Sequence, residues 1–522
     1  MAEQREISIS QFFEKNKHLL GYDNKLRALL TIIKEGVDNS LDATEEARIL
    51  ADLYIKIEEV DKEKYKVVIK DNGPGILEKH IPNVFGKLLY GSKFHRYRQS
   101  RGQQGLGISG CVLYAQLTTG EPTTIISSVG DGKIHKFKLT IDVNKNEPKI
   151  VESSVLESKD KWHGVQVTFL ALGQYREHKQ SVLEYIKQTA VSNPFANITF
   201  DSPTGRYVFA RGVDKLPVEP KEILPHLYGI EVGVLGRMLQ HTSARSVGTF
   251  FTSEFSRVGK TSADEICKIA GVDPKNAPKK VTHEEVITLV KAAEQVKLSR
   301  PPTDCLSPLG HELVIQGLKK EAKPEWVDAI SRPPEVYRGW PFQIEVGLAY
   351  GGDIKEPTVM RMANRVPLLY MAGDCAITKS VQEVDWRRYG LNNEQMKEAP
   401  LIIMVHMCSV WVPFTSESKE AIANYPEIMK EIKLALQDAG RKLASYLSGV
   451  RKAQALAERK SIFERYAHET AKSLEELTGE EEKQIKTLIA KMVEKRWGEA
   501  IEGVVENGEE EVSAEKGSKE EE

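Results

Sequence analysis

The sequence has little that marks a secreted, zinc-bound or membrane protein. Its five cysteines lie far apart and form no CxxC pair, which argues against a disulfide framework and a structural zinc site. The first residues are polar and include acids, so they do not resemble a signal peptide. The longest apolar-rich run, residues 401–414, is too short and too interrupted to span a bilayer. These absences favour a cytoplasmic protein without a membrane partner.

Neither sign of charge dominates. The 73 Lys and Arg residues nearly balance the 75 Asp and Glu residues, and the formal net charge is −2. A global basic field is therefore lacking, and any contact with DNA must come from local patches. The chain of 522 residues is also too long for one ordinary hydrophobic core, so about three domains are expected.

The pattern of apolar residues changes several times along the chain. Apolar residues at helical spacing over 23–50, followed by alternating strands such as 65–70, predict a two-layer α/β domain. Short helices separated by Gly, Pro and Ser turns come next and predict an all-α insert. Strands then return. Residues 427–477 contain no proline and repeat apolar side chains every three or four positions, which predicts one long helix.

We therefore expect an α+β multidomain chain. Its last segment ends in a tail rich in acids, which should be disordered. The expected parts are an α/β domain with an N-terminal strap at 1–218, a helical domain at 219–306, a second α/β domain ending in the long helix at 307–477, and a C-terminal helix with the acidic tail at 478–522.

Three polar residues of the first predicted helix point to chemistry. Glu35, Asn39 and Asp42 stand at positions i, i+4 and i+7, so they project from one face. Glu35 can polarise a water molecule for attack on a γ-phosphate. Asn39 can supply a neutral oxygen to Mg²⁺, which keeps several waters and binds mostly phosphate oxygens. A solvated polar helix face explains the same spacing equally well.

Two glycine-rich segments follow this helix. Asp71 opens the turn DNGPG, in which Gly73 and Gly75 permit close approach of a ligand ring to the backbone. A carboxylate there can accept a hydrogen bond from an exocyclic amine and so favour adenine, although the turn on its own is more typical of a simple Asx turn. The second segment, 102–110, leads into a helix, and backbone N–H groups at a helix N-terminus cradle phosphates.

The order of these segments resembles that of the GHKL (Bergerat-fold) ATPases. The matching motifs are ExxxNSxDA at 35–43, DNGPGI at 71–76 and GxxGLGxSG at 102–110. The resemblance implies ATP and Mg²⁺ as cofactors, with Glu35 as general base, Asn39 as Mg²⁺ ligand and Asp71 as the acid that reads adenine. It also implies further residues near the base, around the phosphates and beside the adenine-reading acid: Gly73 and Gly75; Ser92, Lys93, Gly102, Gln103, Gln104, Gly105, Leu106, Gly107, Ile108 and Ser109; and Thr168.

A narrower resemblance runs over almost the whole chain. The segments KEGVDNSLDA, GQQGLGISG, LYAQLTTG, SRVGKTSADEI and FTSESKEAIA look like those of the B subunits of archaeal DNA topoisomerase VI, a type IIB topoisomerase. The helical part resembles their helix-two-turn-helix module, which implies contacts of Arg245, Arg257 and Lys260 with DNA backbone, though ordinary surface charge explains these residues equally well. The part at 307–477 resembles their transducer domain, whose loop lysine, here Lys419, would reach the γ-phosphate.

This resemblance implies a function. The chain would be the ATP-hydrolysing subunit of an enzyme that relaxes and decatenates double-stranded DNA, and ATP binding would close two copies into a dimer. Cleavage would belong to the A subunit of topoisomerase VI in an A2B2 heterotetramer associated with the nucleoid. The absence of an EGDSA- or DxDxD-like stretch agrees with that division. Two alternatives share the nucleotide motifs but do not account for the helical insert: a MutL-like DNA-repair ATPase and a chaperone-like clamp.

Overall fold

The computed structural model describes residues 11, 13, 15–91, 96–102, 105–157, 160–391, 398–416 and 418–493. They form two compact units. The first contains the described residues up to Ile354 together with Thr358–Gln382 and Ile402–Ala435. The second contains Lys355–Pro357, the described part of Glu383–Leu401 and the described residues from Leu436 onward. The four-part division expected from the sequence remains a prediction.

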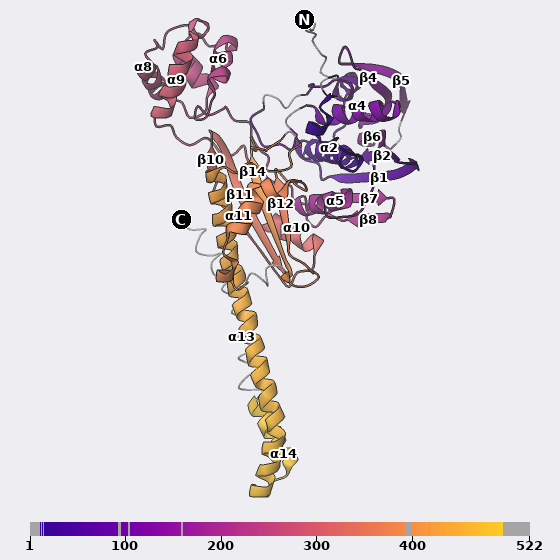
Figure 1. The fold of residues 1–522 in the computed structure, drawn as a ribbon, viewed down its shortest axis with the longest axis vertical. Helices are drawn as coiled ribbons and strands as arrows, with labels where there is room; N and C mark the ends of the chain where they lie inside the picture. The colour runs from indigo at the N-terminus through magenta and orange to yellow at the C-terminus, as the bar shows by residue number, and fades with distance from the viewer. Residues whose placement is uncertain are drawn as a thin grey trace, which may run out of the picture. The chain divides into compact units, whose positions relative to one another are not determined.

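The first unit begins with an eight-stranded sheet that carries helices on one face (Figure 1). The strand order is β5-β4-β3-β6-β2-β1-β7-β8, in which β1 and β7 are parallel and all other neighbours are antiparallel. The strands are β1 (Asp52–Asp61), β2 (Lys64–Lys70), β3 (Thr123–Val129), β4 (Lys133–Asp142), β5 (Glu147–Glu157), β6 (His163–Leu172), β7 (Asn197–Ser202) and β8 (Gly205–Phe209). The helices are α2 (Lys25–Glu46), α3 (Ile81–Gly86), α4 (Gly107–Thr119) and α5 (Val182–Ser192).

Periodicity explains how these two layers meet. Buried and less buried residues alternate along β4, as expected for a strand with one face on the core. The apolar stripe of α2, which includes Leu29, Ile33 and Val37, is fully buried. Gly36 on the same helix allows close approach to β2, because a Cβ there would stand 2.2 Å from Cδ1 of Ile69. This contact brings α2 next to the end of β2, where Asp71 follows.

Four helices come next and have a hydrophobic core of their own. The rings of Phe250, Phe251 and Phe255 are buried, with centroids 5.4 to 6.0 Å apart. The Ser246 side chain caps α7, and Thr282 forms a capping box at the start of α9. The helices are α6 (Val232–His241), α7 (Val247–Glu254), α8 (Lys260–Ala270) and α9 (His283–Gln295).

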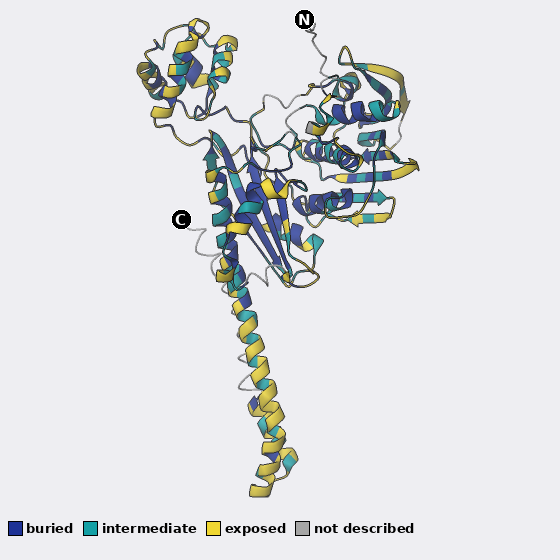
Figure 2. Cartoon of the chain, in the orientation of Figure 1, coloured by how far each residue is buried: buried dark blue, intermediate teal, exposed yellow. Residues whose placement is uncertain are grey.

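A six-stranded sheet follows, and most of its residues are buried (Figure 2). The order is β10-β11-β14-β12-β13, with β9 also paired to β11, and β12 runs parallel to β14. All residues of β14 are buried, which explains its uninterrupted apolar run. The elements are α10 (Gly310–Glu321), β9 (Trp326–Ser331), β10 (Glu335–Tyr337), β11 (Trp340–Tyr350), β12 (Thr358–Ala363), β13 (Val366–Pro367), α11 (Ala376–Glu383) and β14 (Leu401–Ser409).

The long helix expected over 427–477 is confirmed as α13 (Pro426–Thr478), which has 53 residues. Ile428 and Ile432 in its first turns are buried, whereas most side chains in its last half are exposed (Figure 2). A turn at Gly479 leads into α14 (Glu482–Val493). Within the part of the chain that the structure describes, no helix is long and apolar enough to cross a membrane. The acidic tail and most of the expected N-terminal strap lie outside the described residues.

Candidate nucleotide-binding site

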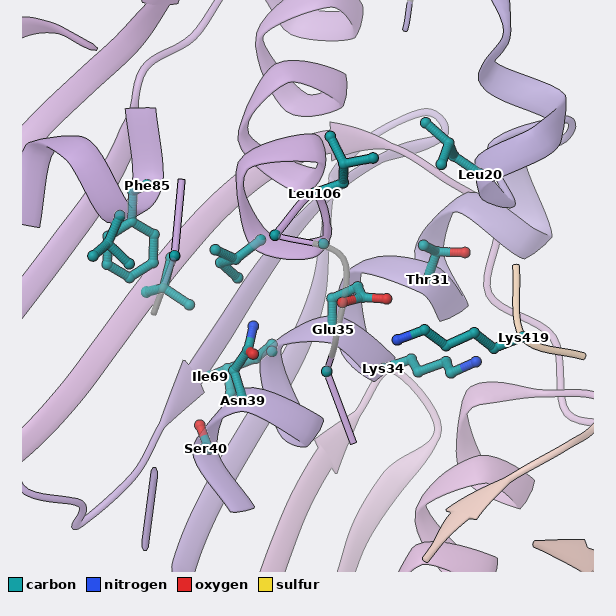
Figure 3. A pocket seen from close by; sticks show the side chains of 18 of the residues that line it. Leu20, Thr31, Lys34, Glu35, Asn39, Ser40, Ile69, Phe85, Leu106 and Lys419 are labelled. Atoms are coloured by element: carbon teal, nitrogen blue, oxygen red, sulfur yellow. The ribbon is translucent and has the colours of Figure 1, made fainter. Parts of the chain in front are cut away.

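A cavity of about 660 Å³ is lined by α2, the start of α4, the end of β2, the first half of β6 and the loop that follows β14. Figure 3 shows the side chains of 18 of the residues that line it. Its volume suits a nucleotide-sized ligand. The predicted site residues that line it are Glu35, Asn39, Asp71, Gly75, Gly102, Gly105, Leu106, Gly107, Ile108 and Lys419.

Glu35 and Asn39 enter the cavity from successive turns of α2 (Figure 3). The Glu35 carboxylate lies against the first residue of α4, since a Cβ on Gly107 would stand 1.8 Å from Oε2 of Glu35. The N-cap residue of α4 is Leu106, which makes no side-chain capping hydrogen bond. The first N–H groups of this helix and the positive end of its dipole are therefore suited to an anion.

Asp71 is buried at the end of β2 and is held by three donors. Oδ1 accepts the backbone N–H groups of Gly73 at 2.8 Å and Val165 at 3.0 Å, and Oδ2 accepts the Ser40 hydroxyl at 2.9 Å. Burial raises the pKa of this carboxyl, and the three hydrogen bonds oppose that rise. The carboxyl orientation is thus fixed by two backbone amides and one residue of α2. Gly73 contributes its amide to Asp71 but does not line the cavity.

The structure does not bring Thr168 to Asp71. Side chains alternate along β6, and those of Val165 and Val167 line the cavity. Thr168 therefore faces the other side of the sheet, where it stands opposite Thr124 of β3. The residue of β6 that supports Asp71 is Val165, through its backbone N–H. This corrects the expectation for Thr168.

The glycine-rich segment places most of its described residues at the cavity. Gly105 has a φ of +62°, in the left-handed region that favours glycine, and the following residues enter α4. Ser109 is buried and does not line the cavity; its hydroxyl lies 3.4 Å from the Leu106 oxygen. Four predicted contacts lie outside the described residues: Ser92, Lys93, Gln103 and Gln104.

Lys419 reaches the cavity from the loop after β14. Its Nζ donates to the backbone oxygen of Arg101 at 3.2 Å, directly before Gly102. Lys34 of α2 runs alongside Lys419, and its Nζ lies 3.4 Å from the Ser418 oxygen (Figure 3). Burial lowers the pKa of Lys34, and the neighbouring Lys419 charge adds to that effect. The loop that carries Lys419 is therefore in contact with the helix that carries Glu35.

Asp42 does not line the cavity, although it shares a helix face with Glu35 and Asn39. Its carboxylate accepts Nη1 of the buried Arg101 at 2.9 Å, and Glu45 pairs with the same guanidinium. Burial would lower the pKa of Arg101, but the charges of Glu45 and Asp42 outweigh it and raise that pKa. Glu45 also pairs with Arg365, which precedes β13. This buried network fixes the backbone that enters the glycine-rich segment.

A second polar cluster lies in the six-stranded sheet. Among the described residues, Glu345, His406 and Cys408 are the only group of three or more His, Cys, Asp or Glu side chains close enough together to hold a metal ion. His406 Nε2 accepts the backbone N–H of Arg365 at 2.9 Å, so its proton belongs on Nδ1, which lies 2.8 Å from Glu345. Both ring nitrogens are thus engaged, and the three side chains form a buried hydrogen-bond network.

Two family models match the chain. A model for the histidine kinase-, DNA gyrase B- and HSP90-like ATPases matches residues 24–145, which contain Glu35, Asp71 and the glycine-rich segment. A model for the transducer of the topoisomerase VI B subunit matches residues 301–459, which contain Lys419. Most residues that line the cavity thus fall within one of the two models.

Curated relatives extend the match to nearly the full length. The chain is 41% identical over an alignment of 562 residues to the type 2 DNA topoisomerase 6 B subunit of Pyrococcus furiosus, covering 97% of this chain and 99% of the relative. The B subunit of the Archaeoglobus fulgidus enzyme is 49% identical over 453 residues, covering 85% of this chain and 74% of the relative. This chain belongs to the family of type 2 DNA topoisomerase 6 B subunits.

Family membership confirms several expectations. The chain has the GHKL ATPase fold and a transducer domain, and it is the ATPase-bearing B subunit of a type II DNA topoisomerase. The ATPase domain implies ATP binding, and membership of this family implies DNA and the A subunit of the enzyme as partners. The MutL-like and chaperone-like alternatives are set aside.

Solved structures also resemble this chain, at low similarity. DNA gyrase B of Myxococcus xanthus gives a TM-score of 0.41 at 11% identity, covering 83% of this chain and 95% of that one. The ATPase region of Saccharomyces cerevisiae topoisomerase II gives 0.39 at 13% identity, covering 86% and 98%.

Several residues at the site were not predicted from the sequence. Ser40 follows Asn39 in the motif NSLDA, so its hydroxyl was available as a signal, but its pairing with Asp71 depends on the approach of α2 to β2. Val165 acts through its backbone, for which the side chain gives no signal. Arg27 and Glu420 at the cavity edge form an ion pair across 393 positions, which no local motif predicts.

Proposed function

We propose that the cavity binds ATP with Mg²⁺ and hydrolyses it, with Glu35 as the general base and Lys419 as the contact to the γ-phosphate. One observation carries the proposal: Glu35 from α2 and Lys419 from the loop after β14 converge on the same cavity (Figure 3). A carboxylate can activate the attacking water, and an ammonium group can neutralise charge that develops on the phosphate.

The other groups around the cavity suit the remaining parts of the nucleotide. The buried Asp71 carboxyl would read the adenine amine. The backbone of Gly102 and of Gly105–Ile108, next to the start of α4, would contact the phosphates together with Ser92, Lys93, Gln103 and Gln104. Asn39 lines the cavity with a neutral amide, which fits Mg²⁺ because this ion takes most of its ligands from phosphates and water. Bound Mg²⁺ would neutralise phosphate charge.

Exchange of the proposed base tests the hydrolysis step. Glu35→Ala should bind a fluorescent ATP analogue with affinity close to that of the wild type and lose turnover by about two orders of magnitude or more, the usual effect of removing a general base. Lys419→Ala should also bind the analogue and lose turnover. If the Glu35→Ala variant turned over ATP at the wild-type rate, its role as base would be rejected.

We further propose that ATP hydrolysis and DNA cleavage are carried out by different subunits, as the names of the relatives suggest. Two copies of this chain would close on ATP binding and pair with two copies of the A subunit, which would cleave the DNA, at the nucleoid. Arg245, Arg257 and Lys260 are exposed on the helical part and available to phosphates of double-stranded DNA. Supercoiled plasmid should be relaxed, and catenanes separated, only when the A subunit, this chain and ATP are all present. Relaxation without ATP, or by this chain alone, would contradict the proposal.

A further inference from the structure

The Lys419 loop is a closed hairpin with an unusual backbone at its tip. The Thr415 N–H donates to the Ala421 oxygen at 2.9 Å, and Phe414 and Ile422 form an antiparallel bridge. Lys419 itself has a φ of +54°, in the left-handed region. The base of the hairpin is also tied to α11, because the N–H of Ala376 donates to the Ile422 oxygen. The hairpin base therefore has anchors of its own, away from the cavity.

Glu420, the residue after Lys419, links this hairpin to α2. Its buried carboxylate forms an ion pair with Arg27, two helical turns before Glu35. The Arg27 guanidinium also pairs with Asp23 at 2.7 Å and stacks 5.1 Å from the centre of the Tyr370 ring. These neighbours fix the guanidinium in one place.

The charges around Arg27 favour its protonated form. Burial would lower the pKa of Arg27, but the hydrogen bond and charge of Glu420, helped by Asp23, outweigh burial and raise it. The backbone oxygen of Glu420 is held as well, since Nη1 of the buried Arg361 lies 3.5 Å away. The Glu420 side chain is thus held by Arg27 and its backbone oxygen by Arg361, directly next to Lys419.

We infer that Arg27 and Glu420 are positioning residues for Lys419. The inference rests on the proposed contact of Lys419 with the γ-phosphate. Glu420 is the residue after Lys419, so the ion pair between Glu420 and Arg27 fixes the position of the Lys419 amine. Because Arg27 and Glu35 share one helix, the pair also holds the proposed base and the proposed cation in one frame. Loss of the pair should slow the chemical step without weakening nucleotide binding, since a misplaced catalytic group mainly lowers kcat.

A double-mutant cycle on the full chain, in complex with DNA and the A subunit, tests the inference. Arg27→Gln and Glu420→Gln should each lower kcat for ATP by about tenfold and leave the affinity for a non-hydrolysable ATP analogue unchanged. The double variant should be no slower than the single variants, because both changes break one interaction. Arg27→Lys keeps the charge and should restore part of the rate. Glu420→Asp, a smaller change, should give an intermediate rate if Glu420→Gln does not fold.

A matched control comes from the same helix. Lys25 pairs with Glu63 at 2.6 Å on the exposed side of α2, away from the cavity. Lys25→Gln removes a comparable charge and should leave kcat and analogue binding unchanged. Equal slowing by Lys25→Gln would show a general effect on α2 and overturn the positioning role of Arg27.

Lys419→Ala, measured in parallel, separates the two ideas. If Lys419→Ala keeps full turnover, the proposed function of Lys419 fails. If Lys419→Ala loses turnover while Arg27→Gln and Glu420→Gln keep it, the proposed function stands and the positioning inference is overturned. Effects of Arg27→Gln and Glu420→Gln that multiply in the double variant, or a loss of analogue binding in either, would also overturn it.

Discussion

Nζ of Lys419 donates a hydrogen bond to the backbone oxygen of Arg101 at 3.2 Å, although 318 positions separate the two residues. The acceptor directly precedes Gly102, the first residue of the glycine-rich segment. The side chain of Arg101 points away from this contact into a buried network with Asp42 and Glu45. The transducer lysine therefore touches a backbone whose position is set by the helix of the ATPase domain.

Removal of the Arg101 side chain should strongly destabilise the first unit. Arg101→Met leaves the buried carboxylate of Asp42 and the adjacent Glu45 without their shared partner, and loss of one partner of a buried ion pair costs about 3–5 kcal/mol. Urea unfolding of the variant and the wild type measures this loss. Arg98→Met is the matched control, because Arg98 pairs with Glu46 near the surface and its loss should cost about 1 kcal/mol or less. Equal losses would contradict the buried network.

Gly107→Ala should abolish ATP turnover in a folded protein. The new Cβ would stand 1.8 Å from Oε2 of Glu35, so the carboxylate would have to leave its place at the start of α4. Alanine also favours the helix, so the unfolding temperature should change little. Turnover and thermal unfolding, measured together, check both statements.

Gly233→Ala serves as the control for that change. Gly233 lies in α6, and a Cβ there would meet nothing within 4 Å. The variant should keep the wild-type rate of ATP turnover. Full activity of Gly107→Ala would show that the Glu35 position in this structure is not needed for hydrolysis.

The sequence was sufficient for the parts of the site that lie in continuous motifs. Glu35, Asn39 and Asp71 belong to short segments on one helix and one strand end, and the structure brings all three to the cavity. Lys419 was found only through the family resemblance, because a loop lysine alone carries no signal.

Pairings over long separations could not be read from the sequence. The ion pair between Arg27 and Glu420 joins residues 393 positions apart, and it forms only when the chain folds α2 against the hairpin after β14. The expectation that Thr168 supports Asp71 was wrong for a different reason. The strand β6 was predicted correctly, but side chains alternate along it, so Thr168 points away from Asp71. The backbone amide of Val165 supports Asp71 instead.

Asp38 should make stability depend on pH in mildly acidic solution. Burial raises its pKa to about 6, with Glu35 adding to the rise and Lys34, Tyr185 and Arg101 opposing it. The folded state therefore holds this proton more tightly than the unfolded state, and the stability it contributes is lost as pH rises through about 6. Asp38→Asn removes the titration and can still accept the Tyr185 hydroxyl.

Comparing Asp38→Asn with the wild type isolates the contribution of the Asp38 carboxyl to the pH dependence of stability. Relative to the wild type, the free energy of unfolding of Asp38→Asn should rise by about 1 kcal/mol between pH 5 and pH 7. Asp214→Asn, an exposed carboxylate, is the control and should show no such trend. A difference that stays flat would mean that Asp38 does not titrate between pH 5 and pH 7 in the folded state, and one that falls with pH would contradict the raised pKa.

Glu345→Gln should destabilise the six-stranded sheet. The Glu345 carboxylate accepts hydrogen bonds from the N–H groups of Leu309 and Gly310, the Ser331 hydroxyl and His406 Nδ1, and the Cys408 thiol lies 3.9 Å from its Oε2. A glutamine would turn its own NH₂ donors toward some of these donors, at a cost of about 3 kcal/mol. Urea unfolding with a probe in the sheet measures the loss.

Two further measurements test the hydrogen-bond network: the pH dependence of the stability lost in Glu345→Gln, and the effect of added metal on the unfolding temperature of the wild type. Burial would raise the pKa of Glu345, but His406 and the two backbone donors at the start of α10 outweigh it and lower that pKa. The stabilising contribution is therefore present above the ordinary glutamate pKa and is lost as pH falls through the lower folded value, so Glu345→Gln should differ from the wild type less in acid than at pH 7. Added Zn²⁺ should leave the unfolding temperature of the wild type unchanged, because His406 already uses both ring nitrogens. A zinc-dependent rise that Cys408→Ser abolished would contradict the hydrogen-bond network and make the cluster a metal site.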